Sequence, residues 1–494
     1  MYSKNVNRIK KIIIIPVLLI VMMGSCISAS AENLPYDAYN YDYWDNIVFS
    51  PAAYIPDGNI SGSDIGVGSF SNPQDMCIAD DGKVYICDTG KNRIVVLKSD
   101  MKTVDKVIES FENEGKEDTF SSPYGVFVSS KNELYIADSE NRRIVVLDEN
   151  AKLVRFVQNP ESEVLEDDYV FTPLKVSVDY ADRVYVVAKG MFEGIMVFDE
   201  GGNFTGFSGT INVKITMVEK IWRKLSTKAQ RAGQILFVPT EFTGIDIDED
   251  GFVYATNVDS EGMQAVRRLN PKGEDVIKKG KSGNIGGDRI ITGTGDYAGA
   301  SNIVDVVVRD KGIYSVLDSR RGRIFTYDHE GNLLYIFGGL GTQAGTFITP
   351  VAIEATGDKI FVLDANQRSV LIFSSTQYGN LINDAIGLRY DGDETLAVEK
   401  WKEVLKLDAN NELANTGIGK AYLTAGDNEL AMKYLKIGMD KTYYSVAFKR
   451  YRNEYLKSHL GYILTGVIVV IAAIWFAVRT VKKKKSEKGA DKDE

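Results

Sequence analysis

A pattern that returns at an interval of fifty residues constrains the fold of this chain more than any other feature. Asp88 and the run Arg93-Ile-Val-Val-Leu97 recur as Asp138 and Arg143-Ile-Val-Val-Leu147. Each copy reads as short alternating strands joined by Asp/Gly turns, such as the turn that ends at Gly82. Internal repeats of this length, built only from strands, indicate one supersecondary unit repeated around a common core.

Six copies can be followed, and each supplies two or three strands plus a weaker fourth. Later copies open near Phe171, Phe242, Ile303 and Pro350. This anatomy predicts a mainly β fold, a six-bladed β-propeller over residues 51–375. The sixth copy lacks an outer strand. We expect Pro51-Ala-Ala-Tyr-Ile-Pro56 to supply it, which would close the ring and remove an open sheet edge.

The repeated residues follow the pattern P-x-(G/D)-(I/V)-x-(V/I), then Y-(I/V)-x-D, then N-R-I, as in Asp138-Ser-Glu-Asn141-Arg-Arg143-Ile144. This pattern resembles NHL repeats, over roughly residues 50–374. The third copy has Ala188 and Ile195 near the Asp and Arg positions, and the fourth has Asn257. The whole chain resembles membrane-anchored bacterial NHL-repeat proteins of the cell surface, which implies that a propeller face binds protein or other ligands.

The period changes to 34 residues beyond Tyr378. Ala397 and Ala431 are one such pair, and Gly392-Asp393 and Gly426-Asp427 fall at expected helix turns. The spacing resembles two tetratricopeptide repeats within residues 376–457. Two copies are fewer than such arrays need to be stable alone, so we expect them to lean on the propeller or on a third helix, about residues 443–456.

The two ends of the chain predict export and membrane anchoring. Residues 1–31 combine a basic start, an apolar run and Ala29-Ser-Ala31, which is typical of a signal peptide cleaved before Glu32. The alternative is acylation of Cys26 in a degenerate lipobox. Residues 458–479 predict one transmembrane helix, because residues 460–478 carry no charge. The basic residues 480–494 favour a cytoplasmic tail, so the body is extracytoplasmic and the cell membrane holds the chain.

Charge and histidine content exclude several functions. The formal net charge is −10, but both ends are basic, which leaves −17 on the body between residues 31 and 479. A body this acidic repels phosphate backbones, so we expect no nucleic-acid partner. The only histidines are His329 and His459, far apart in sequence. A histidine-ligated metal site or a Ser-His-Asp centre is therefore disfavoured, and we predict no cofactor.

An insertion at residues 209–241 carries the one basic island of the acidic body. Its apolar residues recur with helical spacing, which predicts an amphipathic helix. The alternatives are a helix packed on the propeller rim and a contact for a partner or a lipid headgroup. The candidate contact residues are Lys220, Trp222, Arg223, Lys224, Lys228 and Arg231.

Two features near the N-terminus leave alternatives open. Residues 32–50 hold five aromatics between Tyr36 and Trp44, and we interpret the segment as an arm laid over the propeller rather than a sugar-stacking surface. Cys77 and Cys87 lie on adjacent predicted strands. A disulfide between them depends on a turn length that the sequence does not fix.

Carboxylates provide the remaining candidates for chemistry. Asp246-Ile-Asp248-Glu-Asp250-Gly251 matches the start of a calcium loop, but Asn257 stands where the bidentate Glu belongs, so we interpret it as a hairpin turn. The Asp and Arg residues that recur once per blade are interpreted as structural ties. They are Asp88, Asp138, Asp318 and Asp364, with Arg93, Arg143, Arg323 and Arg368.

These observations predict a non-enzymatic, membrane-anchored scaffold or ligand-binding protein that recruits other envelope proteins, such as a transport or surface-assembly complex. The alternative is a lactonase-like hydrolase or lyase with a divalent metal held by carboxylates in the axial channel. His329 is the one histidine within the predicted blades, in a turn expected to point outward, so that alternative depends on carboxylates.

Overall fold

The computed structural model describes residues 34–490, except 161, 163–164, 166–168, 211–240, 260–263, 281–282, 284 and 290–298. Side chains are described as far as Lys482. The predicted signal peptide, residues 1–31, lies outside the described residues. So do all six candidate contact residues of the basic island, Lys220, Trp222, Arg223, Lys224, Lys228 and Arg231, which therefore stay a prediction.

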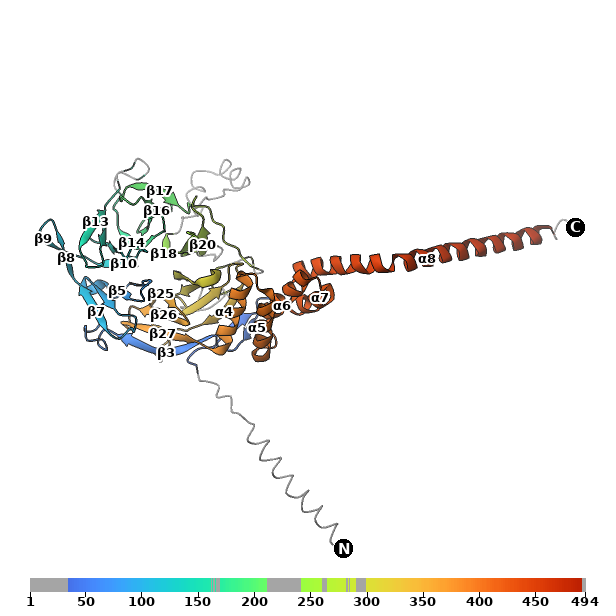
Figure 1. Ribbon diagram of the computed structural model, residues 1–494, viewed down its shortest axis with the longest axis horizontal. Helices are drawn as coiled ribbons and strands as arrows, with labels where there is room; N and C mark the ends of the chain where they lie inside the picture. The colour runs from blue at the N-terminus through green and yellow to red at the C-terminus, as the bar shows by residue number, and fades with distance from the viewer. Residues whose placement is uncertain are drawn as a thin grey trace, which may run out of the picture. The chain divides into compact units, whose positions relative to one another are not determined.

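The predicted six-bladed propeller is confirmed (Figure 1). Blade 1 contains β4 (Asp75–Ile78), β5 (Val84–Asp88), β6 (Arg93–Leu97) and β7 (Val104–Ile108). Blade 2 contains β10 (Pro123–Val128), β11 (Leu134–Asp138), β12 (Arg143–Leu147) and β13 (Leu153–Val157). Blade 3 contains β14 (Pro173–Val178), β15 (Val184–Ala188), β16 (Ile195–Phe198) and β17 (Phe204–Ser208).

The remaining blades vary this plan. Blade 4 contains β18 (Phe242–Ile247), β19 (Val253–Asn257) and β20 (Val266–Leu269). Blade 5 contains β21 (Ile303–Val308), β22 (Tyr314–Asp318), β23 (Arg323–Tyr327) and β24 (Leu333–Phe337). Blade 6 contains β25 (Pro350–Thr356), β26 (Lys359–Asp364) and β27 (Ser369–Ser375). A hairpin of β8 (Ser110–Asn113) and β9 (Lys116–Thr119) lies between blades 1 and 2.

The second strand of each blade explains why continuous apolar runs become strands here. All five residues of β5 are buried, and the same is true of β11. A strand that has packed neighbours on both faces needs no polar alternation. Turns such as the one closed by Gly82, with φ +79°, join these strands, because glycine adopts positive φ at little cost.

The N-terminal chain closes the ring. β3 (Tyr54–Ser61) pairs antiparallel with β27, from Tyr54 opposite Ser375 to Ser61 opposite Ser369. The predicted closing segment, 51–56, overlaps this strand but begins three residues too early. The pairing shifts register next to Pro56, where a residue without a backbone N–H cannot continue the ladder evenly.

A hairpin that precedes β3 in the chain extends blade 5. β1 (Tyr39–Tyr41) pairs with β24 at Tyr39 and Ile336, and β2 (Ile47–Phe49) pairs with β1. The blade-5 sheet therefore has six strands and ends at β2. The first half of the aromatic segment anchors this arm to the propeller, because Tyr39 and Tyr41 are both buried.

Four helices follow the propeller, with short turns between them. They are α4 (Gln377–Tyr390), α5 (Glu394–Leu407), α6 (Glu412–Ala425) and α7 (Asn428–Ile437). Asp393 and Asp427, singled out by the 34-residue period, cap the N-termini of α5 and α7 through their side chains. Gly426 ends α6 with φ +86°. The helices match the predicted positions, while their likeness to tetratricopeptide repeats stays a prediction.

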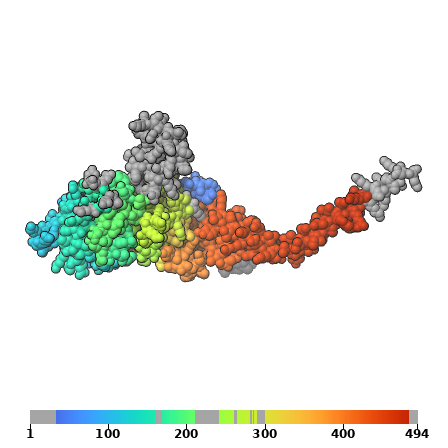
Figure 2. Space-filling view, turned by 90° about the horizontal axis from the view of Figure 1, so that it is seen from above, coloured from blue at the N-terminus to red at the C-terminus, as the bar shows by residue number. Residues whose placement is uncertain are grey.

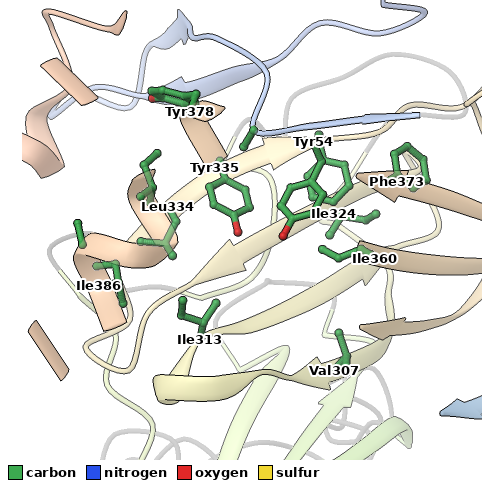
Figure 3. Packing of buried hydrophobic residues seen from close by; sticks show 14 of the residues in the cluster. Tyr54, Val307, Ile313, Ile324, Leu334, Tyr335, Ile360, Phe373, Tyr378 and Ile386 are labelled. Carbon is green, nitrogen blue, oxygen red and sulfur yellow. The ribbon is translucent and has the colours of Figure 1, made fainter. Parts of the chain in front are cut away.

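The helices and the last two blades share one apolar core. Tyr378 and Ile386 of α4 belong to the same apolar cluster as Leu334 and Tyr335 of β24, and all four are labelled in Figure 3. Tyr54 of the closing strand lies in the same cluster. The space-filling view shows this orange helical segment directly against the propeller (Figure 2). Helices α4 to α6 therefore pack against the propeller, as expected for a short helical array.

The last helix, α8 (Lys441–Ala490), is one uninterrupted element. The helix expected at about 443–456 is therefore present as the first part of α8, where Ala447 packs in one apolar cluster with Leu435 of α7, and it continues directly into the apolar stretch. Within α8, residues 441–482 include a window of mean hydropathy 2.4 that is not buried, so this helix is long and apolar enough to cross a membrane.

Loss of the closing-strand aromatic will destabilise the ring. Tyr54 has no exposed surface, and its ring stacks on Phe337 at 4.9 Å. We predict that Tyr54→Ala lowers the free energy of unfolding by about 3–5 kcal/mol, because it leaves a large cavity. Tyr180→Ala, at a tyrosine that is 65% exposed, is the matched control and should stay within about 0.5 kcal/mol of the wild type. Denaturant unfolding of both variants checks this, and equal stability would contradict it.

Candidate functional site

The innermost strand of each blade lines the axis of the ring. Because each inner strand pairs with the next strand in a common register, equivalent positions can be compared across blades. One layer consists of Asp75, Gly125, Lys175, Gly244, Asp305 and Ala352. The layer two residues further along consists of Cys77, Phe127, Ser177, Asp246, Val307 and Glu354. Charged side chains gather in both layers.

Lys175 links carboxylates across the axis. Its Nζ lies 2.5 Å from Asp75 Oδ1 and 3.3 Å from Asp305 Oδ2. The three residues come from blades 3, 1 and 5, which are not neighbours in the ring, so these contacts cross the channel. All three residues are buried. We call Asp75, Lys175, Asp246, Asp305 and Glu354 the axial charge cluster.

The same carboxylates also hold neighbouring blades together. The backbone N–H of Val126, in blade 2, donates to Asp75 at 2.9 Å. The N–H of Ile353, in blade 6, donates to Asp305 at 3.0 Å. In each case the acceptor lies on the inner strand of the preceding blade. Charge-assisted hydrogen bonds of this kind are stronger than neutral ones, so the cluster fastens blade to blade as well as across the axis.

Asp246 makes a third hydrogen bond of this kind between neighbouring blades. In addition, glycine residues let the inner strands of neighbouring blades come close together. Asp246 accepts a hydrogen bond from the N–H of Val308 at 2.6 Å. A Cβ on Gly125 would overlap the carbonyl oxygen of Leu174. Only glycine allows that close backbone approach between blades 2 and 3.

Burial shifts the protonation of the cluster. It raises the pKa of Asp246 to about 7 and that of Asp305 to about 6. It also raises the pKa of Glu354, to which the nearby Asp246 and Asp305 contribute. Burial alone would lower the pKa of Lys175, but the Asp305 and Asp75 carboxylates outweigh it and raise that pKa. The lysine therefore stays charged while the surplus carboxyl groups keep protons toward neutral pH.

These residues do not fit a divalent metal. Carboxylates are suitable ligands for Ca²⁺ or Mg²⁺, but the Lys175 ammonium already lies between Asp75 and Asp305. A second cation there would be repelled at short range by a fixed positive charge. Among the described residues, no group of three or more His, Cys, Asp and Glu side chains is arranged to hold a metal ion.

The recurring aspartates act at the rim of each blade rather than at the axis. Asp88 accepts hydrogen bonds from the Ser71 N–H at 2.6 Å and from Arg93 Nε at 2.8 Å. Asp138, Asp318 and Asp364 accept backbone N–H groups in the same manner. In blade 5 the arginine differs, because Arg323 lies over the ring of Tyr39, 4.6 Å from its centre. These contacts agree with the interpretation as structural ties.

The remaining sequence candidates are placed as follows. Asp248 accepts the N–H groups of Asp250 and Phe252, so the Asp-rich stretch is a hairpin turn. Asp246, at its start, instead belongs to the axial charge cluster. His329 is away from the axis and packs edge-on against Tyr390 of α4, with ring centres 5.1 Å apart.

Cys77 and Cys87 are both buried free thiols in the structure. The register sets Cys77 opposite Tyr85 and Cys87 opposite Asp75, so the two cysteines share a face as a diagonal pair. Diagonal pairs are typically about 7–8 Å apart, which is longer than a disulfide spans. Burial also raises the pKa of both thiols, which suppresses the reactive thiolate.

A second candidate place is the junction between propeller and helices. Glu330, in the last turn of blade 5, pairs with Arg389 of α4 at 3.2 Å and with Lys420 of α6 at 3.1 Å. Arg309 donates to the hydroxyls of Tyr335 and Tyr54, and Tyr335 donates to Asn383 of α4. Blade 5, the closing strand and the helices are thus fixed to one another by partly buried polar contacts.

Two clefts open at this junction. One, of about 770 Å³, lies between loops of blades 5 and 6 and helices α4 and α5, with Arg309, Asn383 and Leu396 among its walls. The other, of about 530 Å³, lies between the β1–β2 hairpin and the turn from α5 to α6, with Trp44 and Asp408 on opposite sides. Neither cleft could be predicted from the sequence, because each is built from segments far apart in the chain.

The NHL repeat family model matches residues 70–97, which cover β4 to β6 of blade 1. No curated protein sequence matches the chain significantly.

Solved structures with some similarity include virginiamycin B lyase from Staphylococcus aureus, at 11% identity over 63% of this chain and 97% of that one, with a TM-score of 0.40. Another is hydrazine synthase from Kuenenia stuttgartiensis, at 11% identity over 63% and 97%, with a TM-score of 0.37. The extracellular domain of a one-component system from B. thetaiotaomicron has 13% identity over 67% and 41%, with a TM-score of 0.38. Similarity at this level carries no information about activity.

Removal of the axial ammonium tests the role of the cluster. We predict that Lys175→Met destabilises the protein by about 3–5 kcal/mol, because it leaves buried carboxylates without their countercharge. The triple variant with Asp75→Asn and Asp305→Asn should recover part of that loss, because the amides carry no charge. Denaturant unfolding of the three proteins is the measurement. An unchanged free energy of unfolding in Lys175→Met would show that the cluster contributes little to the stability of the ring.

The raised pKa of Asp246 predicts the pH dependence. A carboxyl group whose pKa is higher in the folded than in the unfolded state favours folding when protonated, so the contribution of Asp246 to stability should fall as pH rises from about 4 through 7. In Asp246→Asn the amide oxygen can still accept the hydrogen bond from the Val308 N–H, but the side chain cannot ionise. It should flatten the decline between pH 5 and 8 by about 2–3 kcal/mol. Unfolding free energies at the two pH values check this, and an unchanged pH slope would contradict it.

Proposed function

We propose that this chain is a membrane-anchored, non-enzymatic scaffold that binds a partner protein at the junction between its propeller and its helices. The observation that carries the proposal is the contrast between the two candidate places. The axial charge cluster is filled by cross-blade ion pairs and backbone hydrogen bonds. The junction presents two open clefts.

The exposed apolar side chains at the junction support the same proposal. Trp44 is 65% exposed and Phe49 is 73% exposed, and both line the smaller cleft. Clustered exposed apolar residues beside a cleft are typical of a protein-binding surface. Binding of partners by propeller faces and by tetratricopeptide grooves, which the sequence resemblances imply, agrees with this location.

The helix α8 would hold the scaffold at a membrane. With the body outside the cytoplasm and the basic tail inside, the partners are other envelope proteins, such as members of a transport or surface-assembly complex. In this arrangement the helices α4 to α7 join the propeller to the anchor and offer a second docking groove. No cofactor is required for such a role.

A lactonase-like hydrolase or lyase remains the second candidate, because one observation favours it. The pKa of Asp246, raised by burial to about 7, suits a group that exchanges protons near neutral pH. The Lys175 ammonium opposes this reading, since it lies where a metal and a substrate would have to bind. Lactone hydrolysis by the full chain after addition of Ca²⁺ or Mg²⁺, abolished by Asp246→Asn, would favour the enzyme over the scaffold.

Site-specific photocrosslinking in cells tests the scaffold proposal. A photoreactive amino acid would replace Trp44, beside the smaller cleft, or Leu396, which lines the larger one. Tyr180, an exposed tyrosine on blade 3, is the control position. We predict discrete protein adducts at a junction position and none at Tyr180. The absence of adducts at both junction positions, or equal adducts at all three, would contradict the proposal.

A further inference from the structure

The outer edge of the blade-5 sheet is open within the described part of the chain. β2 is the last strand of the six-stranded order, with β1 on its inner side. Its three residues Ile47, Val48 and Phe49 are 44%, 40% and 73% exposed. An open, apolar sheet edge is a template for pairing with another strand, and stable proteins rarely leave one uncovered.

The register shows which backbone groups this edge offers. The N–H of Asp42 donates to the carbonyl of Asn46, and the N–H of Ser50 donates to the carbonyl of Ala38. In an antiparallel pair, hydrogen-bonded and non-hydrogen-bonded positions alternate. Ile47 and Phe49 therefore occupy non-hydrogen-bonded positions, and their N–H and C=O groups are directed away from β1, toward an incoming strand.

The walls of the smaller cleft have a charge that selects the incoming strand. Its lining includes four carboxylates, on Asp42, Asp45, Asp408 and Glu412, against the single guanidinium of Arg289. Arg289 is already paired with Asp45 at 2.6 Å. The cleft is therefore anionic, and it complements Lys and Arg side chains.

Aromatic rings beside the cleft already hold cations. The Nζ of Lys441 lies 4.8 Å from the centre of the Tyr43 ring, and the Arg289 guanidinium lies 5.0 Å from that of Tyr41. Trp44, next to Tyr43, is exposed. A tryptophan face is the strongest of the aromatic partners for a cation, so Trp44 adds a further site for a basic side chain.

We propose that β2 binds an extended, basic segment of a partner protein as an additional antiparallel strand. The apolar side chains of that segment would contact Ile47 and Phe49, and its Lys or Arg side chains would lie over the acidic cleft. This inference rests on the proposed scaffold function and names the class of segment that it recognises. Main-chain hydrogen bonds to an edge provide affinity, while alternate side chains provide specificity. A second copy of this chain is a poorer occupant, because two such acidic clefts would repel each other.

Peptide binding to the full chain, purified in detergent, tests this. The probe is a labelled ten-residue peptide of alternating valine and lysine, followed by fluorescence anisotropy. We expect saturable binding that weakens with added salt. A peptide with glutamate in place of lysine should bind at least about tenfold more weakly. A lysine peptide N-methylated at alternate backbone nitrogens should lose binding, because it cannot pair with the edge.

Two variants test the edge and the charge separately. Phe49→Pro removes an outward N–H that the β1 ladder does not use, and it should reduce affinity for the unmodified peptide. Glu412→Gln removes one charge of the cleft and keeps an acceptor for the N–H of Tyr43, which Glu412 now accepts at 3.2 Å. It should reduce affinity several-fold and lessen the salt dependence. Glu403→Gln on the exposed face of α5 is the matched control and should change neither.

The strand-addition inference is overturned if the N-methylated peptide binds as well as the unmodified one, or if the glutamate peptide binds as well as the lysine peptide. It is also overturned if the chain instead dimerises through β2, seen as a halving of mass in light scattering with Phe49→Lys. Photocrosslinks at the junction together with failed peptide binding would leave the scaffold function standing and remove only this inference. Failure of both would remove both.

Discussion

The pairing of β3 with β27 is the constraint on which the rest of the structure depends. The ring can close only when residues 54–61, at the N-terminal side of blade 1, become the outer strand of blade 6. This pairing also fixes the preceding residues beside blade 5, where β1 and β2 extend the sheet. It places Tyr54 where Arg309 and the helices meet, so the closing strand, the hairpin and the helical array form one connected body.

The axial charge cluster solves a separate problem of the same ring. Six inner strands converge on an axis, and their side chains must fill the channel there and pair its buried polar groups. Lys175 places one ammonium among carboxylates from non-adjacent blades, and the carboxylates accept N–H groups from neighbouring blades. The arrangement holds the blades together, at the cost of buried acids whose pKa values are raised.

The propeller could be predicted from the sequence because its blades are local. Asp88, Asp138 and their fifty-residue spacing repeat within each copy, and the turn glycines and helix-capping aspartates act on residues close by. The axial charge cluster could not, because its ion pairs join residues 100 positions apart or more, as in Asp75 and Lys175. A signal was nevertheless present. Lys175 is a lone charge between Leu174 and Val176 on an inner strand, where an apolar residue would be expected.

The junction was harder to predict for a different reason. The aromatic segment at Tyr36–Trp44 was expected to anchor an arm, and Tyr39 and Tyr41 do so. Trp44 and Phe49 stay exposed because the hairpin ends the sheet, and the opposite wall of their cleft comes from the turn after α5, more than 350 residues further along the chain.

Hydrogen exchange of the hairpin tests the central claim, that the junction is where this protein binds its partner. The backbone amides of residues 43–50 would be followed by mass spectrometry in membranes isolated directly from cells and in the purified chain, with the inner strands as internal reference. We predict slow exchange at 43–50 in the membranes, fast exchange after purification, and no change at the inner strands. Equal exchange at 43–50 in both preparations, with a change confined to the strands that line the axis, would contradict the account.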